Sequence, residues 1–337
     1  MKGYRVAVVG PLSPFGQRVR RFIEEGDFPA IELKLFDSTL ESGATVTQFQ
    51  GEVLVTQLLD ADLFPDLDVM FVGEGVGEDV LALAASAARE GLLTFVADNV
   101  GLSVPVAAHG LNERFLSDDV RLVGVPSTAS ILMGKVLDGI AGSFEIQQAF
   151  ATVLLPASDL GDRAAEELHQ QVVQILNFGA PSTEVLGGQL AFNLVPPPEG
   201  SGENAPENLV AREAAELSGL EADILSVSLV RAPVFHSYAV SLWVELGAEA
   251  TPESIVAAMG EREWIDVTQA LEHSAAIATP VSVAGSDKVH VGSLRPDSAR
   301  PRLFRLWVVA DSVAVDAAAN SLALAQKLLQ PGGVEAG

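Results

Sequence analysis

Hydrophobic positions in the first third of the chain fall into short runs separated by turns and by segments of a different period. Five runs are rich in β-branched and other apolar residues, at positions 4–10, 31–36, 69–72, 92–96 and 120–125. The stretches 17–25 and 80–90 space their apolar residues three or four positions apart, which predicts amphipathic helices. Strands that are apolar on both faces and alternate with helices predict a doubly wound, parallel sheet of the Rossmann type.

The pattern changes after about residue 142. Strands now predominate, at 144–155, 224–230, 239–246 and 303–309, and we expect 224–230 to pair with 239–246. Helical spacing returns at 163–178 and at 314–329. Between them, the Pro-, Gly- and Asn-rich stretch 192–209 predicts an exposed loop.

These patterns predict an α/β protein of two domains. A dinucleotide-binding-type domain is expected over residues 1–125, completed by a C-terminal helix at 312–330. An α+β dimerisation and substrate-type domain with a mixed or antiparallel sheet is expected over 126–311. We predict that the tail beyond residue 330 is frayed.

Composition narrows the possible functions. The 337 residues carry a formal net charge of -25, which disfavours nucleic acid and anionic membranes as partners. No apolar run approaches the roughly 20 residues of a membrane span, and the first residues enter a strand directly, so we expect a cytoplasmic protein. The absence of cysteine excludes disulfides and thiol nucleophiles. The five histidines have no metal-ligand spacing, so we predict no metal site.

The turn after the first strand has the form of a cofactor loop. In "GPLSPFG", Gly10, Ser13 and Gly16 take the three positions of a Gly-rich loop that opens a helix, where backbone N–H groups can face a pyrophosphate. Two prolines in this loop remove donors. Asp37, at the end of the second strand, suits the ribose hydroxyls of NAD, or alternatively caps the following turn.

Two other segments carry candidate chemistry. "VPSTAS" offers hydroxyls at Ser127, Thr128 and Ser130, and either Ser127 or Thr128 can cap the helix that follows. No G-x-S-x-G or S-x-x-K motif supports a nucleophile there. In "LVRAPVFHSYAV", Arg231 can bind a carboxylate and His236 can act as a general acid or base. The alternative is a structural role for both.

In order along the chain, these segments resemble those of the aspartate-semialdehyde dehydrogenase family. "VAVVGPLSPFG" resembles the cofactor loop, "VPSTAS" stands where the family has "PNCST", "QQAFATVLL" stands for "YQAVSGAG", and "LVRAPVFHSYAV" resembles the strand with the substrate arginine and catalytic histidine. The resemblance implies a chemistry in which a cysteine attacks the aldehyde, hydride passes to NADP, and phosphate releases an acyl phosphate.

The same comparison implies which residues remain and which have changed. Gln148, Arg231, His236 and Asn112 match family residues, although Arg231 and His236 are five positions apart instead of seven. Other positions differ from the family. The nucleophile falls on Thr128, an arginine on Val104 and a phosphate-binding lysine on Leu209. The glycines beside the nicotinamide fall on Ala151 to Leu154, and the arginine for the 2′-phosphate falls on Leu40, with Asp37 and Glu41 beside it.

We therefore expect a family member that is inactive in the phosphate-dependent reaction of amino-acid biosynthesis, forms a homodimer and works with a protein partner that remains to be identified. Two alternatives are a semialdehyde dehydrogenase with a non-cysteine mechanism and a non-catalytic NAD sensor. No tightly bound cofactor is expected: NAD binds weakly at most, and NADP is disfavoured by the acidic residues around the end of the second strand.

Overall fold

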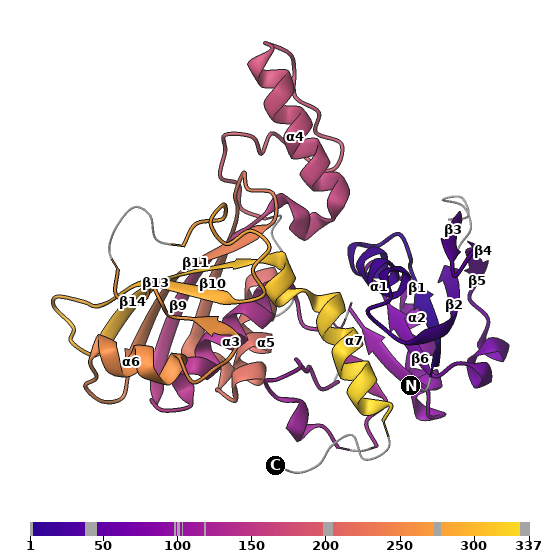
Figure 1. The fold of residues 1–337 in the computed structure, drawn as a ribbon, viewed down its shortest axis with the longest axis horizontal. Coiled ribbons are helices and arrows are strands. Elements are labelled where there is room, and N and C mark those ends of the chain that lie inside the picture. The colour runs from indigo at the N-terminus through magenta and orange to yellow at the C-terminus, as the bar shows by residue number, and fades with distance from the viewer. Residues whose placement is uncertain are drawn as a thin grey trace. The chain divides into compact units, whose positions relative to one another are not determined.

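The structure is a computed structural model that describes residues 3–37, 46–97, 99, 102, 104–117, 119–197, 205–272 and 278–330. Two compact units divide the chain. The first comprises Met1–Pro126 with Ala317–Gly337, and the second comprises Ser127–Asp316. Figure 1 shows both units as ribbons, coloured along the chain.

The first unit is built on a six-stranded parallel sheet. Its strands lie in the order β5-β2-β1-β6-β7-β8. Their bounds are β1 (Tyr4–Val9), β2 (Ala30–Asp37), β5 (Gln57–Leu58), β6 (Val69–Val72), β7 (Leu93–Val96) and β8 (Leu122–Gly124), and every pairing is parallel. A short antiparallel hairpin, β3 (Val46–Phe49) with β4 (Glu52–Val55), accompanies the sheet.

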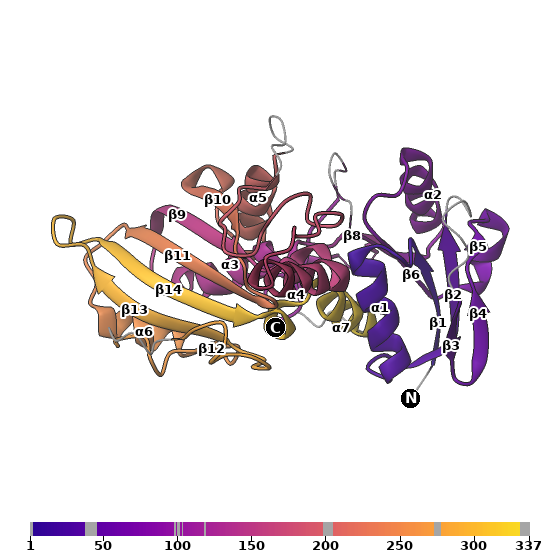
Figure 2. The same cartoon turned by 90° about the horizontal axis from the view of Figure 1, so that it is seen from above.

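Helices cover both faces of this sheet. Val6 and Val8 of β1 pack with α1 (Pro14–Glu25) and α7 (Ala317–Leu328). Ala7 and Val9 face the opposite side and share a core with α2 (Glu78–Arg89). Figure 2 shows α1 and α2 on opposite sides of β1 and β6. The expected Rossmann-type sheet is confirmed, and burial on both faces explains why its strands are continuously apolar.

The second unit contains a mixed sheet. Its order is β10-β9-β11-β14-β13-β12. The bounds are β9 (Ile146–Leu155), β10 (Leu225–Arg231), β11 (Ser237–Leu246), β12 (Ile265–Asp266), β13 (Val289–Pro296) and β14 (Leu303–Asp311). The expected α+β second domain with a mixed sheet is therefore confirmed.

Helices pack on one face of this sheet and leave the other open. α5 (Pro206–Ser218) and α6 (Pro252–Met259) each lie against α3 (Thr128–Ala141) and against the strands, whereas α4 (Asp162–Leu176) extends away from the sheet (Figure 1). Most residues of α3 are buried, because this helix is covered by the sheet on one side and by α5 and α6 on others.

Two features of this unit differ from the sequence-based prediction. The strands β10 and β11 do not pair with each other, because β9 lies between them, parallel to β10 and antiparallel to β11. The predicted loop 192–209 also ends early, because Pro206 occupies the first turn of α5, a position where its missing N–H costs no hydrogen bond. Leu209 is therefore helical.

Short 3-10 turns complete the two units: η1 (Ala61–Asp66), η2 (Glu113–Phe115), η3 (Ala157–Leu160), η5 (Ala222–Ile224) and η6 (Ser312–Val315). Within the described ranges, no helix combines the length and apolar character needed to cross a membrane. The tail beyond residue 330 lies outside the described residues, so its predicted fraying stays a prediction.

Candidate functional site

The N-terminus of α3 forms the centre of the candidate site. Ser127 is the N-cap residue, with extended backbone angles, and its hydroxyl accepts a hydrogen bond from the Ser130 backbone N–H at 3.1 Å. Of the two capping candidates, Ser127 is therefore correct. Thr128 is the first helical residue, so its hydroxyl is one position too late to reach the free N–H groups of the first turn.

A buried carboxylate completes this cap. Glu213, on α5 and 2% exposed, accepts hydrogen bonds from the Ser127 backbone N–H at 3.0 Å and from the Ser130 hydroxyl at 2.6 Å. The two serine hydroxyls are themselves 2.7 Å apart. A negative charge is stabilised at a helix N-terminus by the helix dipole and the free N–H groups. The chain thus supplies its own anion where an external one could bind.

The Thr128 side chain has no activating partner among the described residues. It is 7% exposed and makes no hydrogen bond there to a histidine, carboxylate or lysine. A hydroxyl needs an adjacent base to become a nucleophile near neutral pH. The geometry around residue 128 therefore favours a structural role.

Arg231 and His236 flank the connection between two strands. Arg231 is the last residue of β10, and its Nε atom is shielded from solvent without an acceptor among the described residues. His236 precedes β11 and is exposed, and its backbone carbonyl accepts the Ser312 N–H at 3.1 Å. A guanidinium with an unused buried donor is suited to binding a carboxylate.

The structure does not bring Gln148 to this place. Arg231 is paired with Leu155, at the far end of β9 from Gln148. Seven residues of strand separate the two positions, or about 23 Å at 3.3 Å per residue. The first glycine after β9 is Gly161, in the stretch Ser158–Gly161 that reads "SDLG". If the family's "YQAVSGAG" is placed seven residues further along this chain, its glutamine falls on Leu155, beside Arg231, and its last glycine falls on Gly161.

The predicted cofactor loop adopts the expected turn, but its donors are occupied. Gly10 has a φ of 70°, and a Cβ atom at Gly16 would overlap the Gly10 carbonyl oxygen. Ser13 caps α1 and accepts the Gly16 N–H at 3.0 Å. The Phe15 N–H donates to the Glu74 carboxylate at 3.1 Å. The N-terminus of α1, like that of α3, therefore donates a backbone N–H to a carboxylate of the same chain.

The remaining predicted residues are placed as follows. Asp37 is the last residue of β2 and is half-buried, whereas Leu40 and Glu41 lie outside the described residues. Asn112 is structural, because its side chain bonds the backbone of Ala108 and Val106 at 2.9 and 2.8 Å.

Two ionisable groups with large pKa shifts were not found from the sequence. Burial lowers the pKa of Lys135 to about 8, and its ammonium donates to the Ala314 carbonyl oxygen at 2.7 Å. Burial raises the pKa of Glu113, but hydrogen bonds from His109 and Lys327 outweigh it and bring the value to about 2. Both groups join elements within their own unit, which indicates structural roles.

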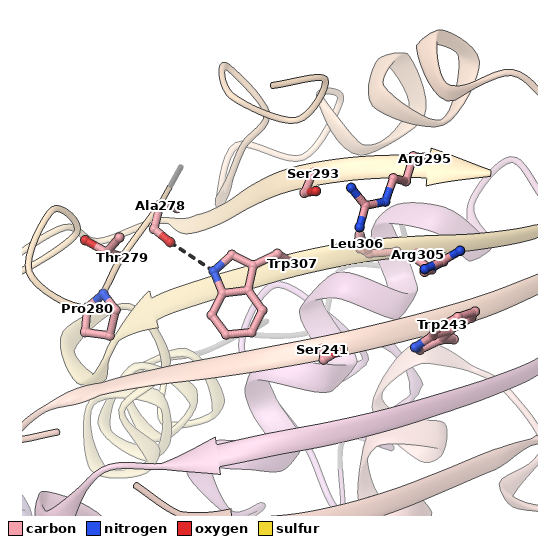
Figure 3. A pocket seen from close by; sticks show the side chains of 10 residues that line it. All are labelled: Ser241, Trp243, Ala278, Thr279, Pro280, Ser293, Arg295, Arg305, Leu306 and Trp307. Atoms are coloured by element: carbon pink, nitrogen blue, oxygen red, sulfur yellow. Dashed lines mark hydrogen bonds between the residues drawn. The ribbon is translucent and has the colours of Figure 1, made fainter. Parts of the chain in front are cut away.

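A cavity of about 500 Å³ lies on the open face of the second sheet (Figure 3). Arg295 and Arg305 are paired across β13 and β14, and Arg305 lies over the Trp243 ring at 4.5 Å. On the same face, Trp307 donates its indole N–H to the Ala278 carbonyl oxygen at 3.0 Å. No sequence motif indicated this cavity, because its residues come from three strands and a loop. Among the described residues, no cluster of potential ligands could hold a metal ion.

The architecture is that of a two-domain dehydrogenase. One unit has a parallel, nucleotide-type sheet, and the other has a mixed sheet with an arginine-histidine pair between two of its strands. Residues 137–315 match the family described as semialdehyde dehydrogenase, dimerisation domain. The chain belongs to the semialdehyde dehydrogenase family.

Relatives support the same assignment over the whole chain. An aspartate-semialdehyde dehydrogenase of Prochlorococcus marinus is 25% identical, and the match covers 96% of this chain and 95% of the relative. The aspartate-semialdehyde dehydrogenase of Bacillus subtilis is 26% identical, and the match covers 97% of this chain and 98% of the relative. The solved aspartate semialdehyde dehydrogenase II of Vibrio cholerae, a complex with ASA, has a TM-score of 0.82 at 24% identity and covers 98% of both chains. That last likeness concerns the fold alone.

The capping geometry gives a test of which residue in the turn is structural. Ser127→Ala should lower the free energy of unfolding by about 1 kcal/mol, because it removes the N-cap acceptor. Thr128→Val keeps the size of the side chain and removes a hydroxyl without a described partner, so its effect should be smaller. Urea denaturation of both variants measures the difference, and a larger loss for Thr128→Val would contradict the assignment of the cap.

Proposed function

We propose that this chain is an aspartate-semialdehyde dehydrogenase homologue that does not catalyse the phosphate-dependent reaction. The observation that carries the proposal is the N-terminus of α3, where Thr128 stands at the position that the resemblance gives to the cysteine. There the buried Glu213 carboxylate accepts the Ser127 backbone N–H and the Ser130 hydroxyl. No cysteine elsewhere in the 337 residues can substitute. A negative charge developing at residue 128 would meet a carboxylate where the reaction needs hydrogen-bond donors.

Other positions support the same proposal. With the match moved along β9, the active-site glutamine falls on Leu155, which cannot hydrogen-bond a substrate. The phosphate-binding lysine falls on Leu209 and the arginine on Val104, so two cations that would attract phosphate are missing. The nucleophile and the anion-binding residues are lost together. A chain that is no longer constrained to catalyse the reaction explains this combination better than an alternative catalytic mechanism does.

Arg231 and His236 indicate which binding function the site retains. The buried, unused donor of Arg231 supports retained binding of a carboxylate ligand without turnover. Such a protein would act through binding, with a protein partner that remains to be identified. A dehydrogenase with a non-cysteine mechanism is the second candidate, and turnover distinguishes the two.

Activity is the first test. With aspartate semialdehyde, phosphate and NADP, the purified protein should show no reduction of the nicotinamide, and Thr128→Cys should remain inactive because Glu213 and Leu155 are unchanged. Absorbance at the reduced-nicotinamide band measures both, with the Bacillus subtilis relative as a positive control. Turnover abolished by Thr128→Ala would show that threonine is a working nucleophile and would contradict the proposal.

We also propose that no nicotinamide cofactor binds tightly, that NAD binds weakly at most and that NADP is disfavoured. Gly10, Ser13 and Gly16 form the loop, but Ser13 and Glu74 already accept the N–H groups that a pyrophosphate would use. Asp37 at the end of β2 suits ribose hydroxyls and repels a 2′-phosphate. Two like charges about 4 Å apart repel by roughly 1 kcal/mol even in water.

Calorimetric titration tests this cofactor proposal. NAD should bind no tighter than the millimolar range and NADP more weakly still. Glu74→Gln should strengthen NAD binding by roughly tenfold, which corresponds to about 1.4 kcal/mol, because a neutral amide competes less with pyrophosphate. Glu25→Gln removes the same charge at the other end of α1 and serves as the control. Tighter binding of NADP than of NAD would contradict the role given to Asp37.

A homodimer is proposed through the open face of the second sheet. The matched family is described by its dimerisation domain. On this face a cross-strand row joins Ser226, Phe150, Trp243 and Arg305, and Phe150 is 47% exposed. Large aromatic side chains on an uncovered sheet face are typical of subunit interfaces.

Light scattering tests the interface. Phe150→Asp should convert the dimer to a monomer, because it places an unpaired charge in the centre of the row. Phe178→Asp, at a fully exposed aromatic position after α4, introduces the same charge and should leave the mass unchanged. A dimer that survives Phe150→Asp would exclude this face.

A further inference from the structure

Three side chains other than the arginine-histidine pair form a chain of polar contacts. The His290 Nε2 atom lies 2.7 Å from the Ser286 hydroxyl oxygen. The His290 Nδ1 atom lies 3.4 Å from a carboxylate oxygen of Asp266. This order of serine, imidazole and carboxylate is the arrangement that activates a hydroxyl nucleophile.

The fold holds the three residues in place. Asp266 and His290 are direct neighbours across β12 and β13. Ser286 belongs to the turn that leads into β13, and Val283 of the same turn packs into a small core with Val309 and Ala239. The turn is therefore anchored on the sheet, which is what a nucleophile needs to keep its distance from a base.

The carboxylate is itself oriented. The Oδ1 atom of Asp266 accepts hydrogen bonds from the Thr268 backbone N–H at 2.8 Å and from its hydroxyl at 2.6 Å, which leaves Oδ2 toward His290. Burial raises the pKa of Asp266, but these hydrogen bonds and the nearby His290 keep it below its ordinary value. An ionised carboxylate selects the tautomer with a proton on Nδ1, so Nε2 is free to accept the serine proton.

Space and a donor for the reaction are also present. A cavity of about 200 Å³ is lined by Asp266 and His290 together with Thr268, Gln269 and Ser282, and Ser286 adjoins it through its contact with His290. The backbone N–H of Asp287, next to Ser286, donates to no acceptor among the described residues. The residue after a nucleophile commonly supplies such an N–H to stabilise an oxyanion.

From these contacts the geometry points to a second chemical site in this chain, in which Ser286, His290 and Asp266 hydrolyse short-chain carboxylic esters. The cavity is smaller than the roughly 300–1,000 Å³ of drug-sized ligand sites, so the acyl group is short. The Asp266 charge disfavours an acyl group that carries its own carboxylate.

The reaction balances with water as the co-reactant. The Ser286 oxygen bonds to the ester carbonyl carbon while its proton passes to His290 Nε2. The carbon–alkoxide bond breaks, and the alcohol leaves with that proton. Water then attacks the acyl carbon, His290 takes and returns a proton, and the carboxylic acid departs as Ser286 is restored.

A fluorophosphonate tests the nucleophile without nicotinamide or semialdehyde, so its outcome is independent of the proposed family function. Ser286 should displace fluoride and become phosphonylated, and peptide mass spectrometry of the full-length protein locates the adduct. His290→Ala should slow labelling about 100-fold or more, and Asp266→Asn about 100- to 10,000-fold. Hydrolysis of 4-nitrophenyl acetate should fall in parallel.

Ser298→Ala, at an exposed serine in the turn between β13 and β14, is the control and should change neither rate. Location of the adduct on the unmodified protein does not depend on the folding of any variant. Thermal unfolding of each variant checks that its fold is kept. An adduct at Ser286 that forms no faster than one at Ser298, or one that His290→Ala leaves unslowed, would overturn the inference.

Discussion

The Glu213 carboxylate at the start of α3 is the interaction on which the second unit depends. It is buried, and it accepts the Ser127 backbone N–H and the Ser130 hydroxyl. An unsatisfied buried polar group costs about 1–3 kcal/mol, and more when it is charged. Because α3 is the helix that the sheet, α5 and α6 all contact, the position of this one carboxylate is coupled to most of the unit's core.

The same arrangement occurs independently in the first unit. There the Phe15 N–H at the start of α1 donates to Glu74, in the turn after β6. In both units a helix N-terminus that could receive a phosphate or a developing oxyanion is matched by a carboxylate from the chain itself. An acidic protein with a net charge of -25 has many carboxylates available for this use. Structural stability and anion binding compete for the same N–H groups, and in each unit an internal carboxylate accepts one of these N–H groups.

Local patterns were enough to predict the sheet of the first unit and the helix cap at residues 127–128, because periodicity and capping act within a few residues. They could not identify Glu213, since it lies 86 residues from Ser127 and its helix follows a Pro- and Gly-rich stretch. The sequence alone could not show that Gln148 lies at the far end of β9 from Arg231, because the pairing of β9 with β10 joins segments that are far apart along the chain. The Ser286–His290–Asp266 contacts depend on a parallel pairing of β12 with β13 that no sequence period records.

The β-bulge in β13 has a wider consequence. Gly292 is paired with Trp307 and Arg295 with Arg305, so β13 contains one more residue than β14 over this stretch, and Ser293 takes up the extra length with a φ of 54°. Leu294 is thereby kept in the core. The bulge divides β13 into two segments of opposite phase, in which odd-numbered residues are internal before it and external after it. Inserting or deleting an odd number of residues in this strand would therefore exchange its inward- and outward-facing side chains, which limits how the length of β13 can vary in evolution.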